Sequence, residues 1–162
     1  MSMAADRTLQ SMAKISDQRS NAVGFGSGKT VLVIDDESVV RDLLKRTLMR
    51  EGFNVVSAAD GIEGLERLAS DRIDIVITDL AMPRMDGREL RDKAKEDHPQ
   101  VPVIFITGQS YKADSKQAQK PDAELFIAKP FKNQDIRLAL QLVMLRLQKA
   151  RNKDKNSLRY NA

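Results

Sequence analysis

Short apolar runs alternate with longer amphipathic stretches along most of the chain. Five runs rich in β-branched residues are typical of strands buried on both faces, and they cover residues 30–35, 53–59, 73–79, 101–107 and 123–128. Apolar residues at helical spacing predict helices over residues 38–52, 60–71, 88–97 and 133–152. Strands that alternate with helices predict a (βα)5 fold, an α/β architecture in which a doubly wound parallel sheet of five strands carries helices on both faces.

The expected helix boundaries have their own signals. Ser38 is a candidate N-cap of the first helix, Gly52 its candidate end, and Asp60 the candidate cap of the second helix. The polar segment at residues 108–122 is only weakly periodic, and we expect at most a short helix there. His98 falls in a predicted loop between a helix and a strand, so we assign it no chemical role.

The last predicted helix carries two apolar stripes. The first contains Ile136, Leu140, Val143 and Leu147, and the second contains Leu138, Leu142 and Leu145. A helix that packs on one face of a sheet needs a single stripe. Two interpretations therefore stay open: the helix buries an unusually broad face, or the second stripe is a docking or homodimer surface.

The overall composition is that of an ordinary globular protein. Of 162 residues, 41% are hydrophobic and 31% are charged, cysteine is absent, and no apolar run reaches the roughly 20 residues that cross a bilayer. The lack of cysteine excludes disulfides and thiolate metal ligands. The N-terminus lacks the apolar core of a signal peptide, so we expect a cytoplasmic protein with no membrane partner.

Charge divides the chain into three parts. Residues 1–29, an expected flexible N-terminal extension, carry a net charge of +2, whereas residues 30–145 carry −3 and residues 146–162 carry +5. The net charge of +4 therefore comes from the two ends. We expect one folded domain over residues 30–150 and a basic C-terminal tail over residues 151–162. Such a tail is most simply a solubilising end, and nucleic acid is not expected as a partner.

The segment FGSGKT at residues 25–30 looks like the end of a phosphate-binding loop, but it fails two requirements. The pattern G-x-x-x-x-G-K-[ST] needs a glycine at position 23, where the chain has Val23. It also needs a strand before the loop and a helix after it, whereas a strand follows here. We therefore expect Gly24, Gly26 and Gly28 to form a flexible hinge.

Polar side chains gather at the predicted carboxyl ends of four strands. These residues are Asp35 and Asp36 after the first strand, Asp79 and Thr107 at the ends of the third and fourth, and Lys129 after the fifth. Each alone could be a cap, a turn residue or a surface lysine, but ligands of open parallel sheets bind at this edge. Carboxylates about 4 Å apart repel by about 4 kcal/mol at a dielectric of roughly 20. Because Mg²⁺ prefers carboxylate oxygens and accepts phosphate oxygens, the joint pattern predicts a Mg²⁺ site.

Four motifs at this edge resemble those of a known family. They are Asp35-Asp36, Asp79 followed by LAMPRMDG, Thr107-Gly108, and Lys129-Pro130. Together they resemble the receiver domain of two-component response regulators, and the resemblance covers residues 30–150. It implies the flavodoxin-like receiver fold with strand order 2-1-3-4-5. It also implies docking or dimerisation through the last helix.

The resemblance assigns roles to the residues of the site. It implies that Asp79 is the phosphoacceptor and that Thr107 and Lys129 contact the phosphoryl group. The implied Mg²⁺ ligands are Asp35, Asp36, Asp79 and the main-chain carbonyl of Ala81. Lys129 supplies a cation, and the resemblance implies that its peptide bond to Pro130 is cis.

The resemblance also implies a conformational switch. Thr107 would turn its hydroxyl toward the phosphoryl group, and Phe126, three residues before Lys129, would follow it inward. Simple core packing is an equally good explanation for Phe126. Ala81 and Gln109 occupy positions that influence the lifetime of the phosphate in the family, and both differ from the commoner choices there.

Three functions are compatible with this sequence. The first is a stand-alone receiver, a switch and not an enzyme beyond its own phosphorylation and dephosphorylation. It would take a phosphoryl group from a histidine kinase or a phosphotransfer protein and then bind a downstream protein, because only a basic tail follows residue 150. The second is a receiver module from a hybrid histidine kinase or a larger response regulator. The third is a phosphatase with Asp79 as nucleophile, which Ala81 disfavours because a second carboxylate is missing there.

Overall fold

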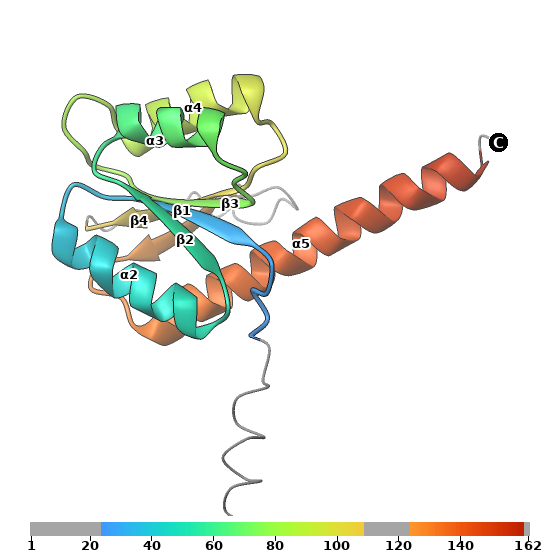
Figure 1. Cartoon of the computed structure of the whole chain (residues 1–162), viewed down its shortest axis with the longest axis horizontal. Helices are drawn as coiled ribbons and strands as arrows, with labels where there is room; N and C mark the ends of the chain where they lie inside the picture. Colours follow the sequence, from blue (N-terminus) through green and yellow to red (C-terminus); the bar gives the residue numbers. More distant parts are fainter. Residues whose placement is uncertain (1–23, 109–123, 161–162) are drawn as a thin grey trace, which may run out of the picture.

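The computed structural model of the chain describes residues 24–108 and 124–160 (Figure 1). Most of the expected N-terminal extension and most of the weakly periodic segment at 108–122 lie outside these residues. Within the described part, no helix combines the length and the apolar character needed to cross a membrane.

Five parallel strands form one sheet, as the apolar runs predict. The strands are β1 (Thr30–Ile34), β2 (Asn54–Ala58), β3 (Ile75–Asp79), β4 (Val103–Thr107) and β5 (Leu125–Ala128). Their order in the sheet is β2-β1-β3-β4-β5, and every neighbouring pair is parallel. The expected α/β fold class and the strand order 2-1-3-4-5 are therefore confirmed. The order reverses between β1 and β3, which is where open sheets of this type bind ligands.

Four described helices cover the two faces of the sheet. They are α2 (Ser38–Arg50), α3 (Gly61–Ser70), α4 (Gly87–Asp97) and α5 (Asn133–Tyr160). In Figure 1, α2 and α5 lie below the sheet and α3 and α4 lie above it. Alternate residues of β1 serve the two faces, because Val31 and Val33 belong to the core with α2 and α5, whereas Leu32 and Ile34 belong to the core with α3 and α4.

The starts of α2 and α3 differ in how they are capped. Asp60 caps α3 as expected, because its side chain accepts hydrogen bonds from the N–H groups of Ile62 and Glu63. The prediction for Ser38 is wrong: Ser38 is already helical, and the N-cap is Glu37, whose side chain makes no capping bond. The N–H of Glu37 instead donates to Asp35 Oδ1 over 2.9 Å. The acidic turn after β1 thus organises the start of this helix.

The segment expected to be a glycine hinge is packed against the body of the domain. The N–H of Gly26 donates to the carbonyl of Glu51 over 2.9 Å, and the Phe25 ring meets the Phe53 ring edge-on at 5.4 Å. A Cβ at Gly24 would lie 2.1 Å from the carbonyl oxygen of Glu51, and one at Gly26 would lie 2.3 Å from the Phe53 ring. The hinge prediction is therefore wrong for Gly24 and Gly26, which permit close packing.

Helix α5 is longer than the sequence pattern predicts. The expected end was near residue 152, but the helix continues to Tyr160 and projects away from the body (Figure 1). The segment expected to be a basic tail is therefore largely helical. Residues 146–160 contain neither glycine nor proline, so no residue there stops the helix.

Of the two apolar stripes of α5, the first is mostly buried and the second is exposed. Ile136, Leu140 and Val143 are buried in the core at 1%, 0% and 2% exposure. Leu138, Leu142 and Leu145 are exposed at 56%, 42% and 55%. The interpretation of one broad buried face is therefore wrong, and the second stripe is a surface.

Candidate functional site

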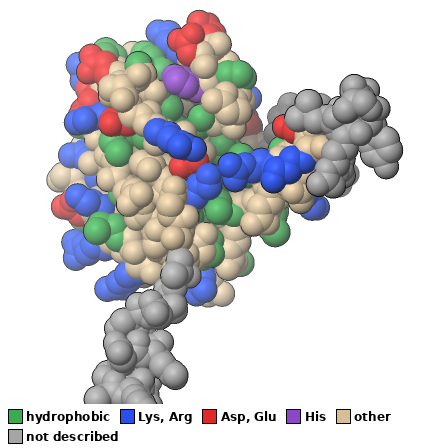
Figure 2. Space-filling model, turned by 45° about the vertical axis from the view of Figure 1, so that its right-hand side comes forward, with side chains coloured by type: hydrophobic (Ala, Val, Ile, Leu, Met, Phe, Trp, Pro, Cys, Tyr) green, Lys and Arg blue, Asp and Glu red, His purple; other side chains and the backbone are tan. Residues whose placement is uncertain are grey.

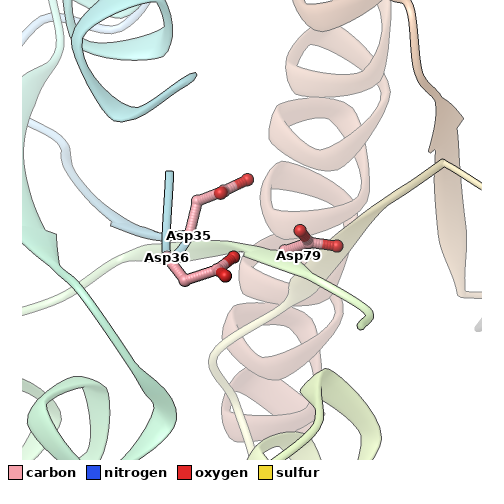
Figure 3. Close-up of side chains that lie close together, drawn as sticks. All are labelled: Asp35, Asp36 and Asp79. Atoms are coloured by element: carbon pink, nitrogen blue, oxygen red, sulfur yellow. The ribbon is translucent and has the colours of Figure 1, made fainter. Parts of the chain in front are cut away.

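The sequence-predicted site residues meet at the carboxyl edge of the sheet. Asp35 and Asp36 follow β1, Asp79 ends β3, Thr107 ends β4 and Lys129 follows β5. The register places Asp79 beside Ile106 and Thr107 beside Ala128, so these strand ends are level. Figure 3 shows the side chains of Asp35, Asp36 and Asp79 lying close together.

The three aspartates form one compact carboxylate cluster. One oxygen from each of Asp35, Asp36 and Asp79 lies within 4.8 Å of the other two. Asp35 and Asp79 are buried at 1% and 6% exposure, whereas Asp36 is exposed. Buried carboxylates without compensating cations are costly. Positive charge next to the cluster would therefore stabilise it, and the cluster is accessible to solvent on the side of Asp36.

Lys129 supplies part of that positive charge. Its Nζ lies 3.0 Å from Asp79 Oδ2, 3.1 Å from Asp35 Oδ2 and 3.4 Å from Glu37 Oε1. The N–H of Lys129 donates to the carbonyl of Thr107 over 2.7 Å, which fixes the start of the loop after β5 against the end of β4. The Lys129–Pro130 peptide is cis, as expected.

The pKa values in the cluster reflect this crowding. Burial raises the pKa of the Asp35 carboxyl, and the hydrogen bonds from Glu37 N–H and from Lys129 only partly offset that effect. Burial alone would lower the pKa of Lys129, but its bonds with Asp79 and Asp35 outweigh burial and raise it. Lys129 is therefore positively charged, and this one cation faces the carboxylates of Asp35, Glu37 and Asp79.

This donor set fits a hard divalent cation. The three carboxylates of the aspartate cluster (Asp35, Asp36 and Asp79) and the Lys129 ammonium have a summed formal charge of −2. Carboxylate oxygens are the ligands that Mg²⁺ prefers. Burial raises the pKa of Asp35 by removing water from its carboxylate, and the attraction of a bound cation would offset that energetic cost. The observed geometry is therefore compatible with the predicted Mg²⁺ site.

The loop after β3 fixes the carboxylate of Asp79. The N–H of Ala81 donates to Asp79 Oδ1 over 3.1 Å, and the N–H of Leu80 donates to the carbonyl of Ile106 over 2.8 Å. Gly87 closes the loop, because its N–H donates to the carbonyl of Leu80 over 3.0 Å. A Cβ at Gly87 would lie 2.4 Å from the carbonyl oxygen of Asp79, so only glycine fits there without a shift.

One polar residue of the site was missed by sequence reasoning. Arg41, one turn into α2, donates from Nη1 to the carbonyl of Asp35 over 2.7 Å and to the carbonyl of Asp36 over 3.2 Å. It therefore holds the backbone of the acidic turn rather than its side chains. The position of Arg41, five residues after Asp36, does not by itself predict these hydrogen bonds. They can be predicted only when the shape of the turn between β1 and α2 is known.

Comparison with protein families decides what kind of domain carries this site. The sequence model of the family described as "Response regulator receiver domain" matches residues 31–141. The chain belongs to this family. The family predicted from the four motifs is therefore confirmed.

Curated relatives of this receiver domain share about a third of the aligned residues with it. Response regulator MprA of Mycobacterium ulcerans (strain Agy99) is 34% identical over 116 residues, which are 72% of this chain and 50% of that protein. MprA of Mycobacterium tuberculosis (strain ATCC 25618 / H37Rv) is 33% identical with the same coverage. The chain thus spans about half the length of the curated relatives it matches.

Solved structures agree with the receiver fold. A response regulator receiver domain protein from Clostridium thermocellum is 30% identical and has a TM-score of 0.64, with 76% of this chain and 97% of that chain covered. TrrA from Thermotoga maritima, solved in complex with Mg²⁺ and BeF, is 29% identical with a TM-score of 0.62, covering 71% of this chain and 98% of that chain.

The residues expected to act as a switch lie next to the receiver site. Thr107 is buried at 3% exposure at the end of β4. The Phe126 ring stacks on the Phe105 ring with centroids 5.1 Å apart and an interplanar angle of 19°. Gln109 lies outside the described residues. His98 is the C-cap of α4, where its N–H donates to the carbonyl of Ala94 over 2.8 Å, and it lies between a helix and a strand as predicted.

Proposed function

We propose that this receiver domain is a phosphorylation-dependent signalling switch in which Asp79 accepts the phosphoryl group. One observation carries the proposal: Asp79 sits in the three-carboxylate cluster with Lys129 Nζ 3.0 Å from its Oδ2. The phosphoryl donor would be a phosphohistidine of a histidine kinase or a phosphotransfer protein. The phosphorylated surface would then bind a downstream protein.

In the proposed transfer, a carboxylate oxygen of Asp79 attacks phosphorus. An O–P bond forms, the P–N bond of the phosphohistidine breaks, and its electron pair returns to the donor imidazole. The Ala81 N–H and the Lys129 Nζ hold the two Asp79 oxygens in place. Mg²⁺ held by Asp35, Asp36, Asp79 and the Ala81 carbonyl would neutralise charge on the carboxylates and the transferred oxygens.

The proposed switch follows from the new charge. A phosphoryl group adds about −1.5 to −2 charges, and Lys129 and the Thr107 hydroxyl would contact its oxygens. Thr107 stands at the end of β4, two residues after Phe105, which stacks on Phe126. A shift of Thr107 would therefore alter the space beside Phe126 and bias an existing equilibrium between two packings.

The lifetime of the phosphate is the finer part of the proposal. Ala81 is exposed, and its methyl group cannot hydrogen-bond an attacking water or the phosphoryl group. Gln109 is neutral where the family often has an acid. We infer that Ala81 and Gln109 together set a lifetime unlike that of receivers with polar residues at both positions.

The receiver domain could act in either of two kinds of protein. The first is a stand-alone cytoplasmic receiver that forms a homodimer through the exposed leucines of α5. A receiver module of a hybrid kinase or a larger response regulator is the second, and the half-length match to the curated relatives is compatible with it. A phosphatase with Asp79 as nucleophile is disfavoured by Ala81, which offers no second carboxylate.

Labelling with acetyl phosphate tests the proposal. The wild type should take up one phosphoryl group per chain in a Mg²⁺-dependent reaction, and Asp79→Asn should take up none. Asp42→Asn, an exposed aspartate of α2, is the matched control and should label normally. A labelled Asp79→Asn would refute the assignment of the acceptor, and steady turnover of acetyl phosphate would favour the phosphatase.

A further inference from the structure

The distal part of α5 is a free-standing basic helix. Its residues 146–155 hold five basic side chains and one acidic side chain, Asp154. All side chains from 148 to 155 are exposed, and the helix projects beyond the body of the domain (Figure 1). A helix fixes the positions of these charges, which an extended solubilising tail would not do.

The cations of this helix form two rows. Lys149 and Lys153 are four residues apart and share one flank, and so do Arg151 and Lys155. The second pair is offset by two residues, and at about 100° per residue the two pairs lie on nearly opposite flanks of the helix. None of these four residues forms an ion pair within the part of the chain that the structure describes.

A basic groove continues from this helix onto the body of the domain. A cavity of about 1020 Å³ lies between α5 and the amino-terminal edge of the sheet, and its lining carries six cationic side chains against three acidic ones. Lys29 is paired with Asp74 and Arg91 with Glu124, but Arg72 and Lys95 also face the groove. Figure 2 shows Lys and Arg side chains in a row that crosses this face and runs onto the projecting helix.

We infer that the distal part of α5 and this groove bind duplex DNA through its phosphate backbones. The major groove of B-DNA is about 12 Å wide and admits one α-helix, so two rows of cations on opposite flanks would face the two phosphate strands. The deep, narrow major groove of duplex RNA would not admit the helix. The surface lies at the sheet edge opposite Asp79, so the residues that would bind DNA are not those of the proposed phosphoryl site.

A membrane fits this helix less well than DNA does. Helices that lie in a membrane interface need a continuous apolar face, and between residues 148 and 155 the only apolar side chain is that of Ala150. An acidic protein would also attract these cations, but it would not present two parallel lines of negative charge to the two opposite rows. Both are therefore kept as competing outcomes of the experiment.

Fluorescence anisotropy of the full chain with a short labelled DNA duplex tests this inference. If the four cations each neutralise one phosphate, affinity should fall roughly 150-fold between about 50 and 200 mM salt. Lys149→Gln/Lys153→Gln and Arg151→Gln/Lys155→Gln should each weaken binding and reduce the slope of log affinity against log salt by about 1.8. Lys45→Gln/Arg50→Gln removes the same charge from α2, where both side chains are exposed, and should bind like the wild type.

Competing ligands decide the specificity of the surface. Duplex RNA, vesicles containing phosphatidylserine, and polyglutamate should each bind more weakly than the DNA duplex. The inference is overturned if no DNA binds at low salt, or if the α2 variant loses as much affinity as the α5 variants. Equal or tighter binding of RNA, of vesicles or of polyglutamate would also overturn it.

Discussion

Lys129 Nζ lies 3.0 Å from Asp79 Oδ2, and the same nitrogen lies 3.1 Å from Asp35 Oδ2. One lysine therefore bridges two buried carboxylates that come from different strands. Burial raises the pKa of Asp35 in spite of its bond to Lys129, so negative charge is unfavourable at the edge where the phosphoryl group is proposed to bind. Functional sites commonly keep such unfavourable interactions at a cost in stability.

Asp35→Asn should make the metal-free domain more stable. Burial raises the pKa of Asp35 above its ordinary value of 3.8, so the folded state favours the protonated form, and stability falls as the pH rises through 3.8 and above. At neutral pH the neutral asparagine removes this penalty. Thermal unfolding in a chelator should show a higher Tm for Asp35→Asn than for the wild type.

Added Mg²⁺ should reverse this order. At 100-fold excess over its Kd, Mg²⁺ should stabilise the wild type by about 2.7 kcal/mol, and Asp35→Asn should gain much less. Asp42→Asn on α2 should behave like the wild type in both conditions. A lower Tm for Asp35→Asn in the chelator would contradict the origin of the raised pKa.

Arg41→Gln should weaken Mg²⁺ binding without removing a ligand. Arg41 donates to the carbonyls of Asp35 and Asp36, and residues that orient metal ligands typically contribute about 10–100-fold to affinity. We expect a loss of about 10-fold, measured by Mg²⁺ titration of thermal stability. Arg46→Gln, on an exposed part of the same helix, should leave the affinity unchanged, and an equal loss in both variants would remove the positioning role.

Much of this architecture could be predicted from the sequence because it depends on local patterns. The apolar runs predicted all five strands, and parallel strands bring Asp35, Asp79 and Lys129 to one edge whatever the details of packing. The contacts of Arg41 could not be predicted, since they join a side chain to carbonyls through the shape of one turn. The end of α5 was missed because the polar residues after Asn152 carry no periodic signal, although nothing in them stops a helix.

Gly87→Ala should disturb the phosphoacceptor loop, whereas Gly108→Ala should not. A Cβ at Gly87 would lie 2.4 Å from the carbonyl oxygen of Asp79, which is backbone and cannot turn aside. At Gly108, no atom of the described residues would lie within 4 Å of the added Cβ. Overpacking of this kind costs about 1–3 kcal/mol. Urea unfolding should show that loss for Gly87→Ala only, and labelling with acetyl phosphate should slow in the same variant; equal stability of both variants would contradict the close fit.

Asp74→Asn should destabilise the domain at neutral pH and much less in acid. Burial would raise the pKa of Asp74, but the hydrogen bonds from Lys29 Nζ and from Thr30 N–H outweigh it and hold the pKa below 3.8. The stabilising effect is therefore present above pH 3.8 and is lost as the pH falls through the lower folded-state pKa. We expect a cost of about 1–2 kcal/mol at pH 7.

Denaturant unfolding at a series of pH values measures this effect. The difference between wild type and Asp74→Asn should shrink as the pH falls below about 4. Asp42→Asn should show no difference from the wild type at neutral pH. A gap between wild type and Asp74→Asn that stays constant down to strong acid would mean that the ion pair with Lys29 is not its source.

Leu138→Glu/Leu145→Glu should abolish the proposed homodimer and leave the fold intact. Both leucines are more than half exposed, at 56% and 55%, so the substitutions remove no core packing and the Tm should change little. Light scattering should show a concentration-dependent dimer for the wild type and a monomer for the variant. Val39→Glu/Met49→Glu on α2 replaces two apolar residues that are exposed at 77% and 57%, and it should not change the mass. If the α5 variant keeps the wild-type mass and partner binding, the exposed leucines of α5 do not form an interface.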